Sequence, residues 1–69
     1  MDETIAADLK ASAQAMEELQ LATHEHRVAM TAGDWERAED ARQRAVAQFE
    51  VHLDALTRAN RRLEMIGGG

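Results

Sequence analysis

The stretch Ala32-Gly33-Asp34-Trp35 decides the fold of this 69-residue chain. Gly33 is the only glycine apart from the three at Gly67-Gly68-Gly69, and the chain contains no proline. Glycine favours the left-handed conformation that follows a helix, and aspartate is a good N-cap for the next helix. The stretch therefore predicts a tight turn at 33–34 between two helices.

Both sides of this turn have the composition of long helices. Residues 3–32 and 35–66 are rich in Ala, Leu, Glu, Gln, Arg and Met, which are the strongest helix formers. A connection of two residues makes the two helices antiparallel neighbours. We therefore expect an all-α, antiparallel two-helix hairpin over residues 1–66, similar to a coiled coil, with a flexible glycine tail at 67–69.

Spacings of three and four residues alternate along both halves, which is typical of a left-handed coiled-coil seam. In the first half the predicted seam comprises Ile5, Leu9, Ser12, Met16, Leu19, Thr23, His26 and Met30. In the second half it comprises Trp35, Ala38, Arg42, Ala45, Phe49, His52, Leu56, Ala59, Leu63 and Ile66. We expect these side chains to lie between the two helices.

A second set of apolar residues flanks the predicted seam, at Leu21, Val28, Val46 and Leu53. An apolar stripe wider than one a/d seam indicates a bundle. The width favours a homodimer in which two hairpins form a four-helix bundle, and a hairpin docked on another helical protein would cover the stripe equally well. The expected interface residues are Leu21, Val28, Trp35, Val46, Phe49 and Leu53.

The histidines predict polar seam positions and no metal site. His26 is expected beside Arg42 in a polar layer of the seam, either as a register device or as a pH-sensitive layer. His24 and His26 point to opposite sides of a helix, so they do not share a metal ion. The hairpin register places His52 level with Met16 and far from His26. We expect neither a metal nor a cofactor.

Charge and composition exclude several function classes. The chain carries 13 acidic and 8 basic residues, a formal charge of −5. This balance argues against nucleic-acid binding, because the arginines are interleaved with acids and phosphates demand a basic face. No run of 18 apolar residues is present, the acidic start lacks the apolar region of a signal peptide, and no cysteine is present. We therefore expect a cytoplasmic protein that does not interact with membranes.

The ends of the predicted hairpin carry opposite charges. Asp2, Glu3 and Asp8 open the first helix, and Arg58, Arg61 and Arg62 close the second. Each cluster suits the helix dipole at its own end, and the hairpin brings the two clusters together.

The hydroxyl residues show no arrangement of nucleophile, base and orienting group, and the chain is too short to enclose a cleft. We expect no enzymatic activity.

The turn sequence Ala32-Gly33-Asp34-Trp35-Glu36, followed by Arg42 and Arg44, resembles the turn of the flagellar FliT-type export chaperones. Members of that family are small, acidic and all-helical, and a Gly-Asp-Trp turn joins their first two long helices. The resemblance implies a chaperone that holds export substrates or regulators on its helical surfaces. Small hairpin co-chaperones of type III secretion needle subunits are similar in size and architecture.

These observations leave three functions open. The leading hypothesis is a small interaction module, a chaperone or adaptor that binds a partner helix on its apolar stripe. The first alternative is a structural homodimer or assembly subunit that buries the same stripe on itself. The second alternative is an acidic phage-type inhibitor that mimics nucleic acid.

Overall fold

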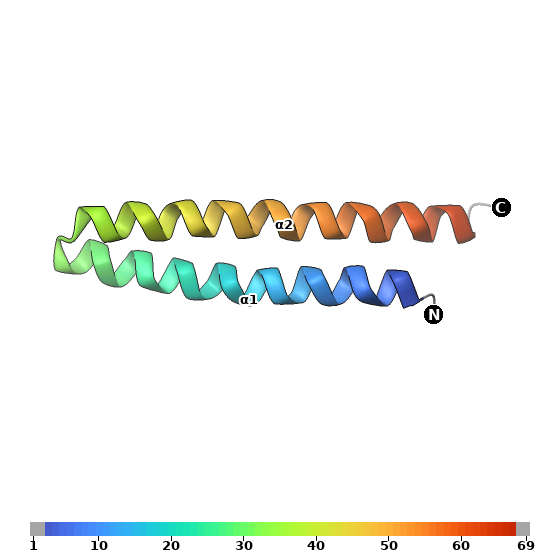
Figure 1. Cartoon of the computed structure of the whole chain (residues 1–69), viewed down its shortest axis with the longest axis horizontal. Helices are drawn as coiled ribbons and strands as arrows, with labels where there is room; N and C mark the ends of the chain where they lie inside the picture. Colours follow the sequence, from blue (N-terminus) through green and yellow to red (C-terminus); the bar gives the residue numbers. More distant parts are fainter. Residues whose placement is uncertain (1–2, 68–69) are drawn as a thin grey trace.

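The computed structural model describes residues 3–67 and contains two long helices that pack against each other (Figure 1). Helix α1 spans Glu3–Ala32 and α2 spans Trp35–Gly67. The predicted hairpin is therefore confirmed. Gly67 was expected in the glycine tail but is the last residue of α2, whereas Gly68, Gly69 and Asp2 lie outside the described residues.

The turn is closed by the hydrogen bonds that its sequence predicts. Gly33 has a φ of +74°, in the left-handed region, and its N–H donates to the carbonyl of Met30. The N–H of Asp34 donates to the carbonyl of Ala29, which completes a Schellman C-cap for α1. The Oδ1 of Asp34 accepts a bond of 3.2 Å from the N–H of Arg37 and so caps the N-terminus of α2.

The seam between the helices is built mainly from alanine. Seven of the eight buried apolar residues among those described are alanines, and the exception is Ile5. The seam positions of α1 are Ile5, Asp8, Ser12, Ala15, Leu19, Ala22, His26 and Ala29. The seam positions of α2 are Ala38, Ala41, Ala45, Gln48, His52, Ala55, Ala59 and Arg62. We call this set the alanine seam; its spacings alternate between three and four, as positions a and d of a heptad do.

The predicted seam was therefore half wrong. Its a positions lie in the contact except Ile66, which is 64% exposed near the end of α2. Its other positions lie one residue beyond the true d positions, at position e of the heptad. Phe49 and Leu56, for example, are 47% and 38% exposed, whereas Ala41 and Ala55 are fully buried. The physical reason is size: alanine at position d lets two helices approach closely, and large side chains are displaced to the edge of the contact.

The hairpin is a rod of 54 × 14 × 12 Å between Cα atoms, with a radius of gyration of 15.8 Å. A globular chain of this length has a radius of gyration of about 11 Å. The rod form leaves both broad faces of the hairpin open to solvent. Within residues 3–67, neither helix combines the length and the apolar character needed to cross a bilayer.

Candidate interaction surface

The large apolar side chains form a stripe on one broad face of the hairpin. We call this set the outer stripe; it occupies position e of both helices and position b of α2. Its members are Leu9, Met16, Met30, Trp35, Val46, Phe49, Leu53, Leu56 and Leu63. All except Met16, which is half-buried, are between 38% and 64% exposed. The alanine seam and the outer stripe are thus two adjacent apolar surfaces on the same pair of helices.

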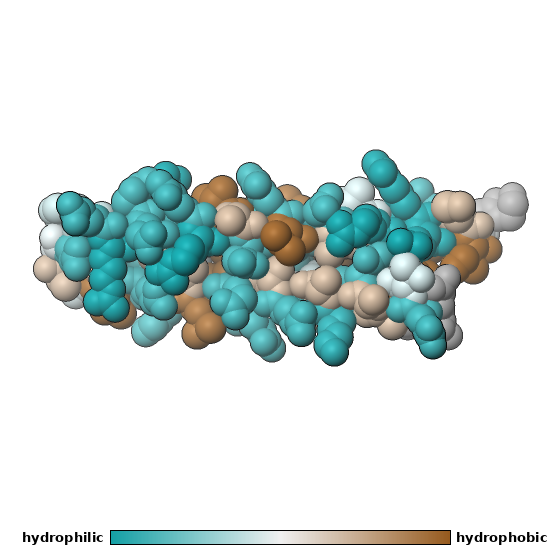
Figure 2. All heavy atoms as spheres, in the orientation of Figure 1, coloured by the Kyte–Doolittle hydropathy of each residue, from teal (hydrophilic) through white to brown (hydrophobic). Residues whose placement is uncertain are grey.

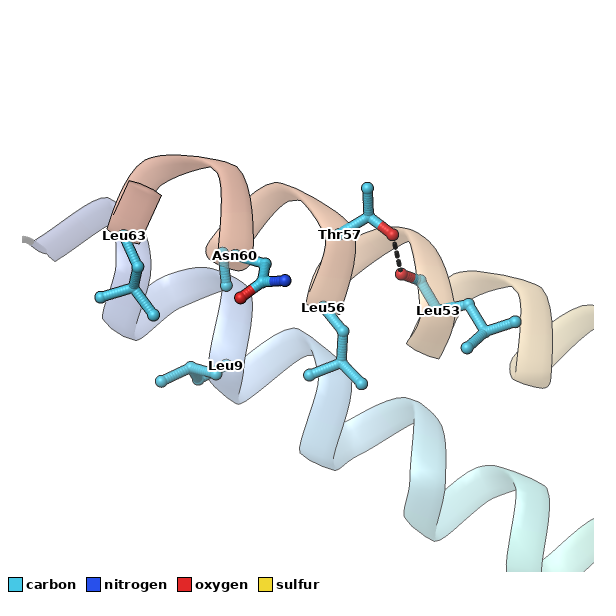
Figure 3. Close-up of a pocket in the computed structure, with 7 residues that line it drawn as sticks. Leu9, Leu53, Leu56, Thr57, Asn60 and Leu63 are labelled. Carbon is cyan, nitrogen blue, oxygen red and sulfur yellow. Dashed lines mark hydrogen bonds between the residues drawn. The ribbon is translucent and has the colours of Figure 1, made fainter. Parts of the chain in front are cut away.

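The outer stripe is hollowed at the end of the hairpin away from the turn. A groove of about 360 Å³ lies there, lined by Leu9 from α1 and by Leu53, Leu56 and Leu63 from α2 (Figure 3). Leu56 and Leu63 project from α2 toward α1 along this groove. Thr57 donates its Oγ1 hydrogen to the carbonyl of Leu53 at 2.9 Å, so this hydroxyl is bonded to its own helix. The groove is therefore mainly apolar and suits an apolar side chain from another molecule.

The structure separates the six predicted interface residues into two groups. Trp35, Val46, Phe49 and Leu53 lie on the outer stripe. Leu21 and Val28 lie at position c of α1. Leu21 follows Met16 by five residues, so its side chain points roughly 140° around the helix axis from that of Met16. Leu21 is 59% exposed and Val28 is 46% exposed. These two residues therefore do not contribute to the same surface as Val46 and Leu53.

The opposite edge of the seam, position g, is charged. Arg44 of α2 forms an ion pair with Glu25 of α1 and a second one, at 3.4 Å, with Asp40. Figure 2 shows one broad face of the hairpin, in the orientation of Figure 1, and this face is mostly hydrophilic. The Arg44 guanidinium donates a hydrogen bond to Glu25 and lowers the pKa of that carboxyl below its usual 4.5. We call this edge the charged flank.

One ion pair interrupts the outer stripe. Arg42 donates two hydrogen bonds to Glu39, at 2.8 and 2.5 Å, and these bonds lower the pKa of Glu39 from 4.5 to about 2. The predicted polar layer of His26 and Arg42 is therefore wrong. His26 is half-buried in the alanine seam, but the Arg42 side chain is 55% exposed and is bonded to its own helix.

Polar residues do occur inside the seam, at other positions. The buried Ser12 places its Oγ 2.7 Å from Nδ1 of His52, where the prediction placed Met16, one helical turn away. Toward the chain ends, the buried Asp8 accepts hydrogen bonds from Nε of Arg58 at 3.3 Å and from Nε of Arg62 at 3.0 Å. The predicted meeting of acidic and basic ends is thereby confirmed for these three residues.

Side chains that bind metal ions do not cluster within residues 3–67. No group of three histidine, aspartate or glutamate side chains there is placed to hold a metal ion. Nδ1 of His52 lies 2.7 Å from the Ser12 hydroxyl, inside the helix contact rather than in an open cleft. This arrangement presents a long apolar stripe on one broad face of the hairpin and a charged flank on the opposite face.

Five buried alanines lie in the seam at positions that were not predicted for it, because larger apolar side chains occupy the next position along the helix: Ala15, Ala22, Ala29, Ala41 and Ala55. A signal for them was present: Ala15, Ala22 and Ala29 recur every seven residues, and Ala41 and Ala55 are two heptads apart. Small residues that repeat every seven positions mark the close contact between the helices. Large apolar residues that repeat one position later mark the surface that stays exposed. Comparison with known proteins finds no matching family, no similar characterised protein and no similar solved structure.

Proposed function

We propose that this chain is a small, non-enzymatic protein-interaction module of the cytoplasm, whose outer stripe binds the helices of a protein partner. The observation that carries the proposal is the position of the large side chains: the hairpin contact uses alanine and leaves Phe49, Leu53 and Leu56 exposed. Burial of apolar side chains is the main driving force of association, and extended exposed apolar patches are typical of interaction sites.

The surface area of the hairpin supports the same proposal. The chain exposes 5158 Å², whereas a compact monomer of 7.7 kDa exposes roughly 4300 Å². A seam made of alanine also contributes little hydrophobic free energy, because alanine removes little apolar surface from water. Covering the outer stripe with another helical surface supplies the larger core that the hairpin lacks.

Two forms of partner agree with this surface. A chaperone or adaptor would present the stripe to the helix of a client, as the resemblance of the Gly33-Asp34-Trp35 turn to FliT-type chaperones implies. A structural subunit would cover the stripe with a second copy in a four-helix bundle. A nucleic-acid mimic draws less support, because several acids are paired with arginines, including Glu25, Glu39 and Asp8.

A matched pair of valines tests the proposal. Val46 lies on the outer stripe and Val51 at position g on the charged flank, and they are 47% and 48% exposed. We would replace each in turn with a photoreactive benzophenone amino acid, irradiate cells that express the full chain, and measure covalent protein adducts. The proposal predicts several-fold more adduct from position 46. Equal yields from the two positions would contradict it.

A further inference from the structure

Residues at position e of α1 and α2 form pairs at similar distances from the turn, and we call each pair a layer. The apolar and polar layers follow the same order along both helices. Met30 and Trp35 lie three residues before and two residues after Gly33, and form an apolar layer at the tip. Leu9 and Leu56 lie 24 residues before and 23 after Gly33, and form an apolar layer toward the open end. Helical residues rise 1.5 Å each, so the members of a layer lie at nearly the same height.

The two layers between these have different characters. Met16 and Phe49 lie 17 residues before and 16 after Gly33, and continue the apolar surface. Thr23 and Arg42 lie ten before and nine after, and are polar. The outer stripe of α1 therefore matches that of α2 layer by layer, including the one polar interruption.

From this match we infer that the outer stripe binds a second copy of the chain, with both turns at the same end of a four-helix bundle. The inference rests on the proposed function and specifies its partner. A two-fold axis along the rod places α1 of one copy on α2 of the other. Every apolar layer then meets an apolar layer, and the polar layer meets the polar layer. The groove beside Leu9, Leu56 and Leu63 receives the partner's leucines.

The opposite arrangement, with the turns at opposite ends, fits less well. It places the polar layer of Thr23 and Arg42 on the partner's leucine layer of Leu9 and Leu56. The ion pair of Arg42 and Glu39 would then be covered by apolar side chains and removed from water, which is unfavourable.

Charge complementarity also favours the same-end arrangement. Arg27 and Glu39 occupy position b of their helices, and each lies six residues from Gly33. When α1 covers α2 of the second copy, Arg27 of each copy lies beside Glu39 of the other, on both sides of the bundle. In the opposite-end arrangement, in the register that places Thr23 on Leu9, Arg27 faces the partner's Ala6 instead. Complementary charges at the rim of an interface select register and orientation.

The available area agrees with a stable dimer. The broad face of the rod measures 54 by 14 Å between Cα atoms, which is roughly 750 Å². Standard protein interfaces bury about 800 Å² per partner. A second hairpin laid along the full length of the stripe therefore gives an interface of ordinary size.

Disulfide crosslinking tests the arrangement in the full chain, which has no cysteine of its own. The double variant Arg27→Cys/Glu39→Cys places cysteines side by side only between copies in the same-end dimer. The control Ala6→Cys/Arg27→Cys places them together only in the opposite-end dimer. Circular dichroism of both reduced variants verifies that they remain helical, and oxidised samples are resolved on a non-reducing gel.

We expect the 27/39 variant to form a covalent dimer. We expect the 6/27 variant and both single variants, Arg27→Cys and Glu39→Cys, to remain monomeric on the gel. Crosslinking of the 6/27 variant instead would overturn the same-end arrangement. The absence of crosslinks in both double variants, with a monomeric mass in solution, would overturn the second copy as the partner. The comparison of Val46 with Val51 judges the proposed function separately, because it detects any protein that covers the stripe.

Discussion

Enlarging one alanine of the seam should destabilise the hairpin, whereas enlarging an exposed alanine of the same helix should not. Ala41 is fully buried at position d of α2. Ala41→Leu adds three carbon atoms at a contact where the two helices lie against each other. Inserting such groups into a packed contact costs about 1–3 kcal/mol, because the helices must separate. Ala47→Leu is the control, since Ala47 is exposed and leucine is nearly as good a helix former as alanine.

The assay is urea unfolding followed by circular dichroism at 222 nm. For a small protein the free energy of unfolding falls by about 1 kcal/mol per molar urea, so Ala41→Leu should lower the midpoint by about 1–3 M. Measurements at two protein concentrations separate this effect from self-association. Equal midpoints for Ala41→Leu and Ala47→Leu would refute the alanine seam, because they would mean that residue 41 does not lie in the contact between the helices.

Three further predictions concern polar contacts and the turn. Asp8→Ala removes the carboxylate that joins Arg58 to α1 and should lower the free energy of unfolding by about 1–3 kcal/mol in the same urea assay. Arg44→Gln should raise the pKa of Glu25 toward 4.5, as followed by NMR titration of the carboxyl carbon. Because the pKa of Glu25 is lowered in the folded chain, its ion pair stabilises the fold above pH 4.5, and this stabilisation is lost as the pH falls through the pKa of the folded chain. An unchanged titration of Glu25 in Arg44→Gln would contradict the ion pair. Gly33→Ala forces an L-residue to adopt a φ of +74° and should cost about 1 kcal/mol in urea unfolding, and an unchanged midpoint would contradict this backbone conformation.

The hairpin was predictable because its signals are local. Gly33 and Asp34 determine the turn through backbone conformation and capping, and both depend only on neighbouring residues. The composition of each half determines the helices in the same local way. The charges of Asp8, Arg58 and Arg62 were predictable too, because an antiparallel pair brings its two chain ends together.

The rotation of each helix about its own axis was not predictable from hydrophobic size. A stripe of large apolar residues at spacings of three and four marks a contact surface but does not say which contact it serves. Phe49 and Leu56 mark the outer stripe, and the weaker recurrence of Ala41 and Ala55 marks the contact inside the hairpin. The pairing of Ser12 with His52 depends on this rotation and on a register difference of one turn, so it could not be derived from the spacing alone.

The most direct test of the outer stripe is the solution mass of two variants by sedimentation equilibrium, beside the unmodified chain. Val46→Glu places a charge on the stripe, and Val51→Glu places the same charge on the charged flank at equal exposure. We predict that the unmodified chain and Val51→Glu sediment at twice the monomer mass of 7.7 kDa, and that Val46→Glu sediments as the monomer. An unchanged mass for Val46→Glu, or equal dissociation of both variants, would contradict the assignment of the outer stripe as the surface of interaction.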